Sequence, residues 1–84
     1  MTTLQVDLFL DLNTMDETGL PWSFVDQAAD PSKIQVGAYI VVGTGRPRAV
    51  ARVVDVRPDG VVHVLPLPGP PSDHLHLLGG RAAS

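Results

Sequence analysis

Hydrophobic and polar residues alternate along positions 4–12. One parity holds only leucine and valine, and the other is mostly polar: Leu4, Val6, Leu8, Leu10 and Leu12 against Gln5, Asp7, Phe9 and Asp11. Because successive side chains of a strand point to opposite faces, this period of two predicts a half-buried strand. We expect Asp7 and Asp11 on its outer face, where simple solvation explains both carboxylates better than acid–base chemistry does.

A short helix is predicted next, over residues 22–29. Pro21 has a fixed φ and lacks an N–H, which suits the first turn of a helix. Asp30 precedes Pro31, and a residue before proline is pushed out of the α region, so the helix ends there. A helix of this length is unstable alone and must pack on the rest of the chain.

Three further strands are predicted from β-branched runs at 38–42, 48–57 and 61–65. The second run has small alanines on one parity and valines on the other, a pattern that suits a tightly curved barrel. Pro-Asp-Gly at 58–60 separates the last two runs. Proline fits the second position of a turn and glycine fits a positive φ, so this sequence predicts a tight hairpin.

The chain after the hairpin is rich in proline. Residues 66–71 are expected to form an extended connection, with a polyproline ligand for another domain as the alternative. Residues 72–78 are interpreted as a short fifth strand, the alternative being a helical turn capped by Ser72. Residues 79–84 have nothing to bury and are expected to be a flexible tail.

Five short strands, a long first connection with a helical turn and a tight hairpin resemble the small SH3-like β-barrel, over residues 4–78. The expected fold is therefore mainly β, a five-stranded SH3-like barrel with one short helix between its first two strands, and a single domain over 1–78. Within this fold group, the Gly-Ala-Tyr-Ile-Val-Val segment at 37–42 is similar to KOW-type barrels of ribosomal proteins and translation factors.

A second resemblance is to the PemK/MazF-type toxin ribonucleases, which are also small barrels. It is carried by Asp-Leu-Asn-Thr at 11–14 and by Gly-Arg-Pro at 45–47. More than thirty residues separate the two pieces, whereas the toxins have a much shorter loop there. No catalytic role is therefore transferred to Thr14 or Arg46, and no catalytic residue is predicted.

Composition and charge narrow the possible functions. The chain has 84 residues, no cysteine and a net charge of -3, so it has neither disulfides nor a thiolate zinc site. No apolar stretch approaches the length of a bilayer helix, and the start lacks the features of a signal peptide, which predicts a cytoplasmic protein without membrane association. Residues 1–35 sum to -5 and residues 36–84 to +2, and the two parts are expected to compensate each other on folding.

The candidate binding residues are arginines and aromatics. Arg46, Arg48 and Arg52 share one parity, so they could grip phosphates or a partner's carboxylates, although arginine also protects an edge strand from aggregation. Tyr39 is the nearest aromatic that could stack on a nucleic-acid base. Trp22 and Phe24 are expected to plug the end of the barrel, with an exposed anchor for a partner as the alternative.

Three histidines are candidates for a zinc site. His74 and His76 would share a strand face, and His63 could join them, but no recognisable motif places a carboxylate nearby. No metal or cofactor is predicted.

The leading hypothesis is a non-enzymatic barrel that binds a protein partner or a second copy of itself. The alternative is an RNA-interacting barrel, either a ribosome-associated factor or a degenerate toxin ribonuclease, with the three arginines on the phosphates.

Overall fold

The computed structural model describes residues 5–44 and 48–83, with side chains as far as residue 78. Within these ranges it is mainly β, with five strands: β1 (Leu8–Phe9), β2 (Trp22–Phe24), β3 (Tyr39–Gly43), β4 (Arg48–Val56) and β5 (Val61–Pro66). Three 3-10 segments accompany them: η1 (Val25–Gln27), η2 (Pro31–Lys33) and η3 (Pro71–Ala83). The prediction of a small, mainly β, five-stranded barrel is confirmed.

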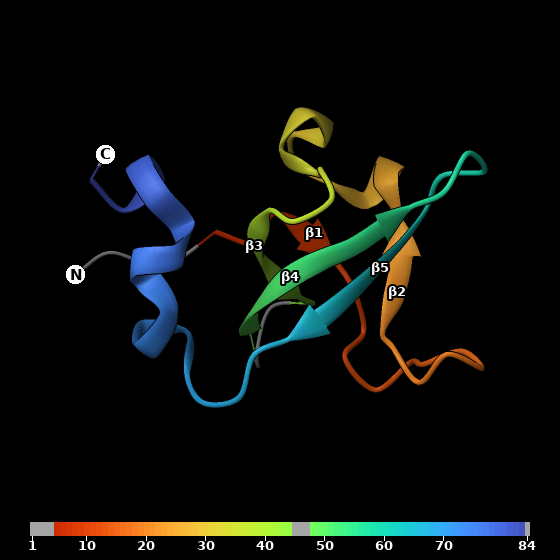
Figure 1. Cartoon of the computed structure of the whole chain (residues 1–84), viewed down its shortest axis with the longest axis horizontal. Coiled ribbons are helices and arrows are strands. Elements are labelled where there is room, and N and C mark those ends of the chain that lie inside the picture. The colour runs from red at the N-terminus through yellow and green to blue at the C-terminus, as the bar shows by residue number, and fades with distance from the viewer. Residues whose placement is uncertain (1–4, 45–47, 84) are drawn as a thin grey trace.

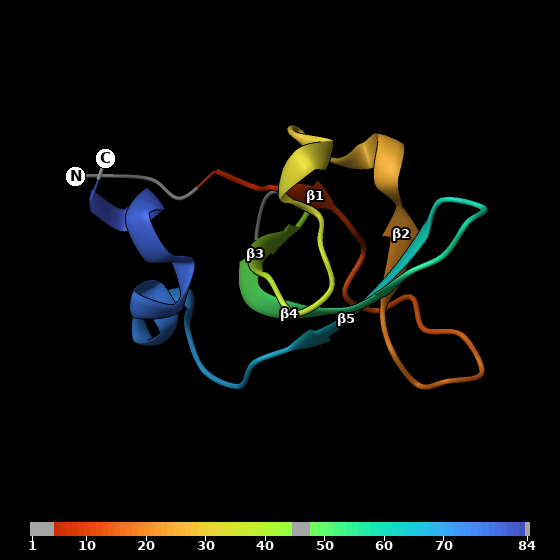
Figure 2. The ribbon, with the colours of Figure 1, turned by 45° about the horizontal axis from the view of Figure 1, so that its top comes forward.

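The five strands form one sheet that curls into a nearly closed barrel (Figures 1 and 2), in the order β1-β3-β4-β5-β2. β1 runs parallel to β3, and the other pairs are antiparallel. The two end strands meet through Ser23, whose Oγ donates to the Phe9 carbonyl oxygen at 2.7 Å. Close by, the backbone N–H of Ala29 donates to the carbonyl oxygen of Asp7 at 2.9 Å. These bonds satisfy backbone groups that an open sheet edge would leave free.

The β3–β4–β5 meander follows the sequence prediction closely. β4 and β5 are joined by the predicted hairpin, in which Gly60 has a φ of +92°. A side chain at this position would strain the backbone, because L residues rarely adopt such a φ. The Asp59 carboxylate accepts a hydrogen bond from the N–H of Val61 at 3.1 Å, which fixes the turn from within.

Within the described ranges, the hydrophobic core of the barrel consists of aliphatic side chains. Its buried members come from β1, β3, β4, β5 and the segments beside them: Leu8, Leu10, Ile34, Ile40, Val42, Ala51, Val53, Val62 and Val64. Small alanine on the inner face of β4 lets the sheet curve tightly, as its sequence pattern predicted.

The interpretation of residues 72–78 as a strand is wrong, and the helical alternative is right. η3 packs on the outer face of β3 and β4, where Leu78 joins buried Val41 and Val50, and Leu75 lies against the same cluster. A 3-10 helix has three residues per turn, so Leu75 and Leu78 fall on one side of it. η3 also runs into residues for which a tail was predicted, and that tail stays a prediction.

The predicted helix over 22–29 is also replaced. Residues Trp22–Phe24 form β2, and only short 3-10 turns follow. Trp22 lies opposite His63, and Phe24 lies opposite Val61, in an antiparallel pairing with β5. This pairing satisfies the outer edge of β5, which a helix in the same place would leave unpaired. Tertiary pairing therefore overrides the helix signal of Pro21.

Asp7 is the third correction, because it is buried rather than solvated. Its side chain is on the outer parity of β1, as predicted, but only 5% of the residue is exposed. Its carboxylate accepts a hydrogen bond from the N–H of Val41 at 2.9 Å. Asp7 lies beside Val41, with which it also shares the backbone bond from its own N–H to the Val41 carbonyl oxygen, and Val41 is itself buried with Leu78 of η3. Asp11, four residues further on, is exposed as expected.

Candidate functional site

The aromatic side chains of this protein lie outside the barrel interior. All four are in the described part of the chain, and none belongs to the buried core. Phe9 is 51% exposed and Phe24 is 46% exposed, while Trp22 is half-buried. Tyr39 packs beside the cluster under η3. Trp22 and Phe24 therefore do not belong to the buried core of the barrel, and their role as anchors for a partner stays a prediction.

Phe9, Trp22 and Phe24 lie on β1 and β2, the two end strands that close the barrel. The Ser23 side chain donates to the backbone carbonyl oxygen of Phe9, so β1 passes beside the centre of β2. The Trp22 and Phe24 rings form an edge-to-face pair, with centroids 5.4 Å apart and an interplanar angle of 87°. Such a pair is a favourable aromatic geometry and holds both rings in place.

Two more exposed apolar side chains lie on the segments next to β2, namely the loop before it and β5. Met15 bridges to Pro21, directly before β2, and is 58% exposed. Leu65 is 47% exposed and lies on the same parity of β5 as His63, which is opposite Trp22. We refer to Phe9, Met15, Trp22 and Phe24 together as the aromatic face.

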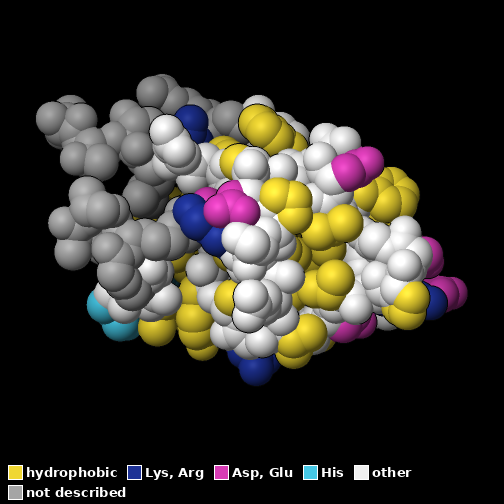
Figure 3. All heavy atoms as spheres, turned by 90° about the horizontal axis from the view of Figure 1, so that it is seen from above, with side chains coloured by type: hydrophobic (Ala, Val, Ile, Leu, Met, Phe, Trp, Pro, Cys, Tyr) yellow, Lys and Arg dark blue, Asp and Glu magenta, His cyan; other side chains and the backbone are white. Residues whose placement is uncertain are grey.

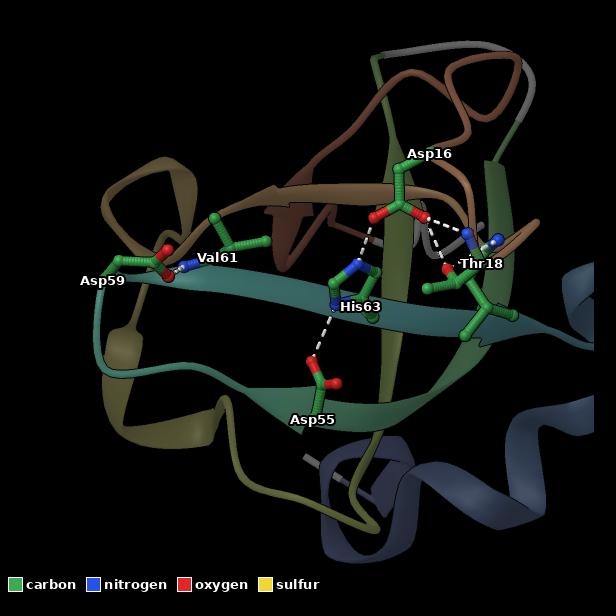
Figure 4. A network of polar contacts seen from close by, with 7 residues as sticks. Asp16, Thr18, Asp55, Asp59, Val61 and His63 are labelled. Atoms are coloured by element: carbon green, nitrogen blue, oxygen red, sulfur yellow. Dashed lines mark hydrogen bonds and ion pairs between the residues drawn. The ribbon is translucent and has the colours of Figure 1, made fainter.

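His63 lies on the outer side of β5, yet only 3% of it is exposed. Its Nε2 donates to Oδ2 of Asp16 at 2.6 Å, and its Nδ1 donates to Oδ1 of Asp55 at 2.8 Å (Figure 4). Asp55 is on the neighbouring strand β4, directly opposite His63, whereas Asp16 belongs to the loop between β1 and β2. We call these three residues the His63 clamp.

The clamp favours a protonated imidazole. The carboxylate of Asp16, and then that of Asp55, raises the pKa of His63, and this effect outweighs the opposing effect of burial. In turn, hydrogen bonds from Thr18 and from His63 lower the pKa of Asp16 to about 2. The Thr18 side-chain and backbone donors both bond to Asp16 Oδ1, so the loop is ordered around this carboxylate.

The chemistry of the clamp is fixation rather than catalysis. Both ring nitrogens of His63 are engaged by carboxylates, so neither is free to take a proton from a substrate. The clamp holds the β1–β2 loop against β5 through Asp16. Met15, the residue before Asp16, is thereby kept close to Trp22, which lies opposite His63. The clamp therefore positions part of the aromatic face.

The predicted arginine stripe is interrupted. Arg48 and Arg52 both lie on β4, but Val50 between them is buried under η3. The rise of a strand puts residues four apart at about 13 Å, so a buried apolar cluster separates the two guanidinium groups. Arg52 lies opposite Tyr39, as a stacking site would require, and is exposed. Arg46 lies outside the described residues.

The histidines do not converge on a metal site. His63 is held by the clamp, and His74 Nε2 lies 2.6 Å from the carbonyl oxygen of Pro68. Within the described ranges, no group of three or more histidine or acidic side chains has the arrangement needed to hold a metal ion.

Sequence reasoning missed Asp16 and Asp55 as partners of His63. Asp55 could have been found, because the hairpin turn fixes which residues of β4 and β5 lie opposite each other, apart from the bulge between Val53 and Asp55. Asp16 could not, because it is 47 residues from His63 and in an irregular loop. β2 had a signal, since Trp22, Ser23 and Phe24 alternate in polarity as a strand does.

The chain matches no protein-family model, no curated protein and no solved structure. The resemblances to KOW-type and PemK/MazF-type barrels thus have no support beyond the small barrel architecture itself. Neither η3 nor the shorter helical turns in the described ranges have the length and apolarity needed to cross a bilayer.

Proposed function

We propose that this protein is a non-enzymatic SH3-like barrel that binds a protein partner through the aromatic face. One observation carries the proposal: the core uses only aliphatic side chains, while two phenylalanines and the single tryptophan are on the surface. In so small a chain, aromatic residues are the largest source of buried apolar area. Leaving them outside the core gives up that gain unless a partner covers them.

The composition of the aromatic face fits this role. Tryptophan and other aromatics dominate the binding free energy of protein interfaces, and methionine adapts to irregular surfaces. The Trp22–Phe24 pair is already ordered before binding, so little side-chain entropy is lost when a partner docks.

The RNA alternative has less support. Nucleic-acid binding without sequence preference uses arginines interleaved with exposed aromatics. Here Arg48 and Arg52 are separated by buried Val50, and only Tyr39 is next to one of them. The exposed aromatics are instead on β1 and β2, the two end strands of the sheet order, whereas β4 is its central strand.

The test is the double variant Trp22→Ser plus Phe24→Ser, used as bait in affinity capture from the source cells. We expect it to remain folded and to lose the proteins that the wild type retains. Val36→Ser is the matched control, because Val36 is 65% exposed and does not belong to the aromatic face. Equal capture by the wild type and the double variant would refute the proposal.

A salt-series binding assay addresses the RNA alternative directly. Binding of a single-stranded RNA at low salt that falls with rising salt and with Arg48→Ala plus Arg52→Ala would favour that alternative. We expect no such binding.

A further inference from the structure

The aromatic face carries a regular pattern of exposed acids. Phe9 is followed two positions later by Asp11, Met15 by Glu17, and Phe24 by Asp26, and all three carboxylate residues are exposed: Asp11, Glu17 and Asp26. Each exposed apolar side chain of β1, the loop and β2 thus has a negative charge close to it in the chain.

These charges are not neutralised within the described structure. Among the described side chains, no lysine or arginine makes an ion pair with Asp11, Glu17 or Asp26. The only base in residues 1–35 is Lys33, on η2. The described arginines of β4 and the hairpin turn, Arg48, Arg52 and Arg57, thus do not pair with these three carboxylates.

The surface view shows one side of the apolar surface. Figure 3 looks onto the side that bears η1, η2 and the β4–β5 turn, and shows hydrophobic side chains gathered in a band with both acidic and basic groups at its margins. Arg57 follows β4 at the hairpin turn; its backbone N–H donates to the carbonyl oxygen of Val61, which lies opposite Phe24. Arg57 is two strands away from β2, so the local net charge at the aromatic face stays negative.

Resting on the proposed function, we infer that the partner presents a basic segment in which lysine or arginine alternates with large apolar side chains. Apolar groups of this segment cover Phe24 and Met15, while its cations meet the carboxylates of Glu17 and Asp26. A guanidinium or ammonium group stacked on the half-exposed Trp22 ring gains a further cation–π attraction. Charge complementarity of this kind sets the partner's identity and speeds its association.

The same charges argue against two other occupants. Phosphate groups of a nucleic acid would be repelled by the acids at Phe9, Met15 and Phe24. In a symmetric dimer each aromatic face would meet its own copy, which would bring like carboxylates together. A basic protein segment can both cover the exposed apolar side chains and neutralise the carboxylates beside them.

Trp22 is the only tryptophan, so its fluorescence reports binding at this face directly. The probes are a short peptide alternating arginine and leucine, the same peptide with glutamate for arginine, and a single-stranded oligouridylate, each titrated into the full chain. We expect a saturable change with the arginine peptide alone, weakened by salt as screening increases.

A matched pair of charge reversals locates the effect. Glu17→Lys should weaken binding of the arginine peptide by roughly threefold to tenfold at low salt, as expected for a charge at the rim of an interface. Asp73→Lys changes the net charge equally but lies on η3, which packs on β3 and β4 at the far end of the molecule from β2 (Figure 1). It should leave binding nearly unchanged.

The outcomes separate this inference from the proposed function. Binding of the glutamate peptide or of the RNA, equal effects of the two reversals, or no response to any probe would overturn the basic-segment partner. If Trp22→Ser plus Phe24→Ser still abolished capture of a cellular partner, the proposed function would survive that result. If the double variant captured the same proteins as the wild type, both the proposed function and the basic-segment partner would be refuted.

Discussion

The inside of the barrel and the aromatic face divide the hydrophobic residues of this protein by kind. The inside holds valine, leucine, isoleucine and alanine, which pack closely in a narrow barrel. The aromatic face holds two phenylalanines, the tryptophan and a methionine, partly open to solvent. The difference indicates that stability and recognition are assigned to different side chains, so each can be changed with little effect on the other.

The largest expected effect is on the inside. Leu8→Ala removes a fully buried side chain from β1 and should lower the free energy of unfolding by about 3 kcal/mol. For a chain of this length that is a large part of a total of roughly 4 to 12 kcal/mol. Urea unfolding followed by circular dichroism measures it. A loss below about 1 kcal/mol would mean that the barrel interior is not closely packed.

The His63 clamp should come second, because it joins the loop to the sheet. His63→Gln removes the cation between two carboxylates and should lower the unfolding midpoint by less than Leu8→Ala, since both aspartates are partly exposed and screened by water. Asp55→Asn in the His63→Gln background should add little, because the partner is already lost. Additive losses in this double-mutant cycle would show that the clamp contributes nothing as a unit.

The pH dependence of stability should follow the same clamp. The pKa of His63 is raised above its ordinary value of 6.5, so its contribution is complete below pH 6.5 and is lost as the pH rises through the higher folded value. The pKa of Asp16 is lowered from 3.8 to about 2, so its contribution is present above pH 3.8 and is lost as the pH falls toward 2.

Urea midpoints measured across pH therefore test the clamp without a binding partner. The wild type should lose stability above pH 6.5, and His63→Gln should be flatter over the same range. Parallel curves for the two proteins would mean that His63 has the same proton affinity in the folded and the unfolded state.

The smallest expected effect on stability belongs to the aromatic face. Phe24→Ser should change the free energy of unfolding by no more than about 0.5 kcal/mol, as at other exposed positions. Differential scanning calorimetry beside Leu8→Ala gives the contrast. A loss comparable to that of Leu8→Ala would mean that Phe24 is part of the core, and would end the division of roles.

The sequence could predict the meander because its signals are local. β3, β4 and β5 are β-branched runs, and the turn at Asp59-Gly60 is encoded by residues that adopt its dihedral angles by themselves. Their boundaries were predicted to within one residue. The aliphatic parity of β1 was likewise correct for Leu8 and Leu10.

The rest depended on contacts between distant residues. β2 becomes a strand because β5 offers an unpaired edge, and Asp7 is buried beside Val41, 34 residues away, to whose N–H its carboxylate bonds. The same holds at the candidate site: Trp22 and Phe24 were recognised as possible anchors, but their choice between core and surface depends on where β2 pairs. The clamp requires the loop to return to β5, which no local pattern encodes.

β1 pairs with β3 in parallel, through residues 34 positions apart, such as Asp7 and Val41. Contacts of such high sequence separation form late in folding, since a long loop must first be closed, whereas the meander needs only short turns. β1 should accordingly join a meander that already exists and leave it first when the protein opens. Native-state hydrogen exchange should show this order as earlier loss of protection at Leu10 than at Val53, which lies at the centre of β4.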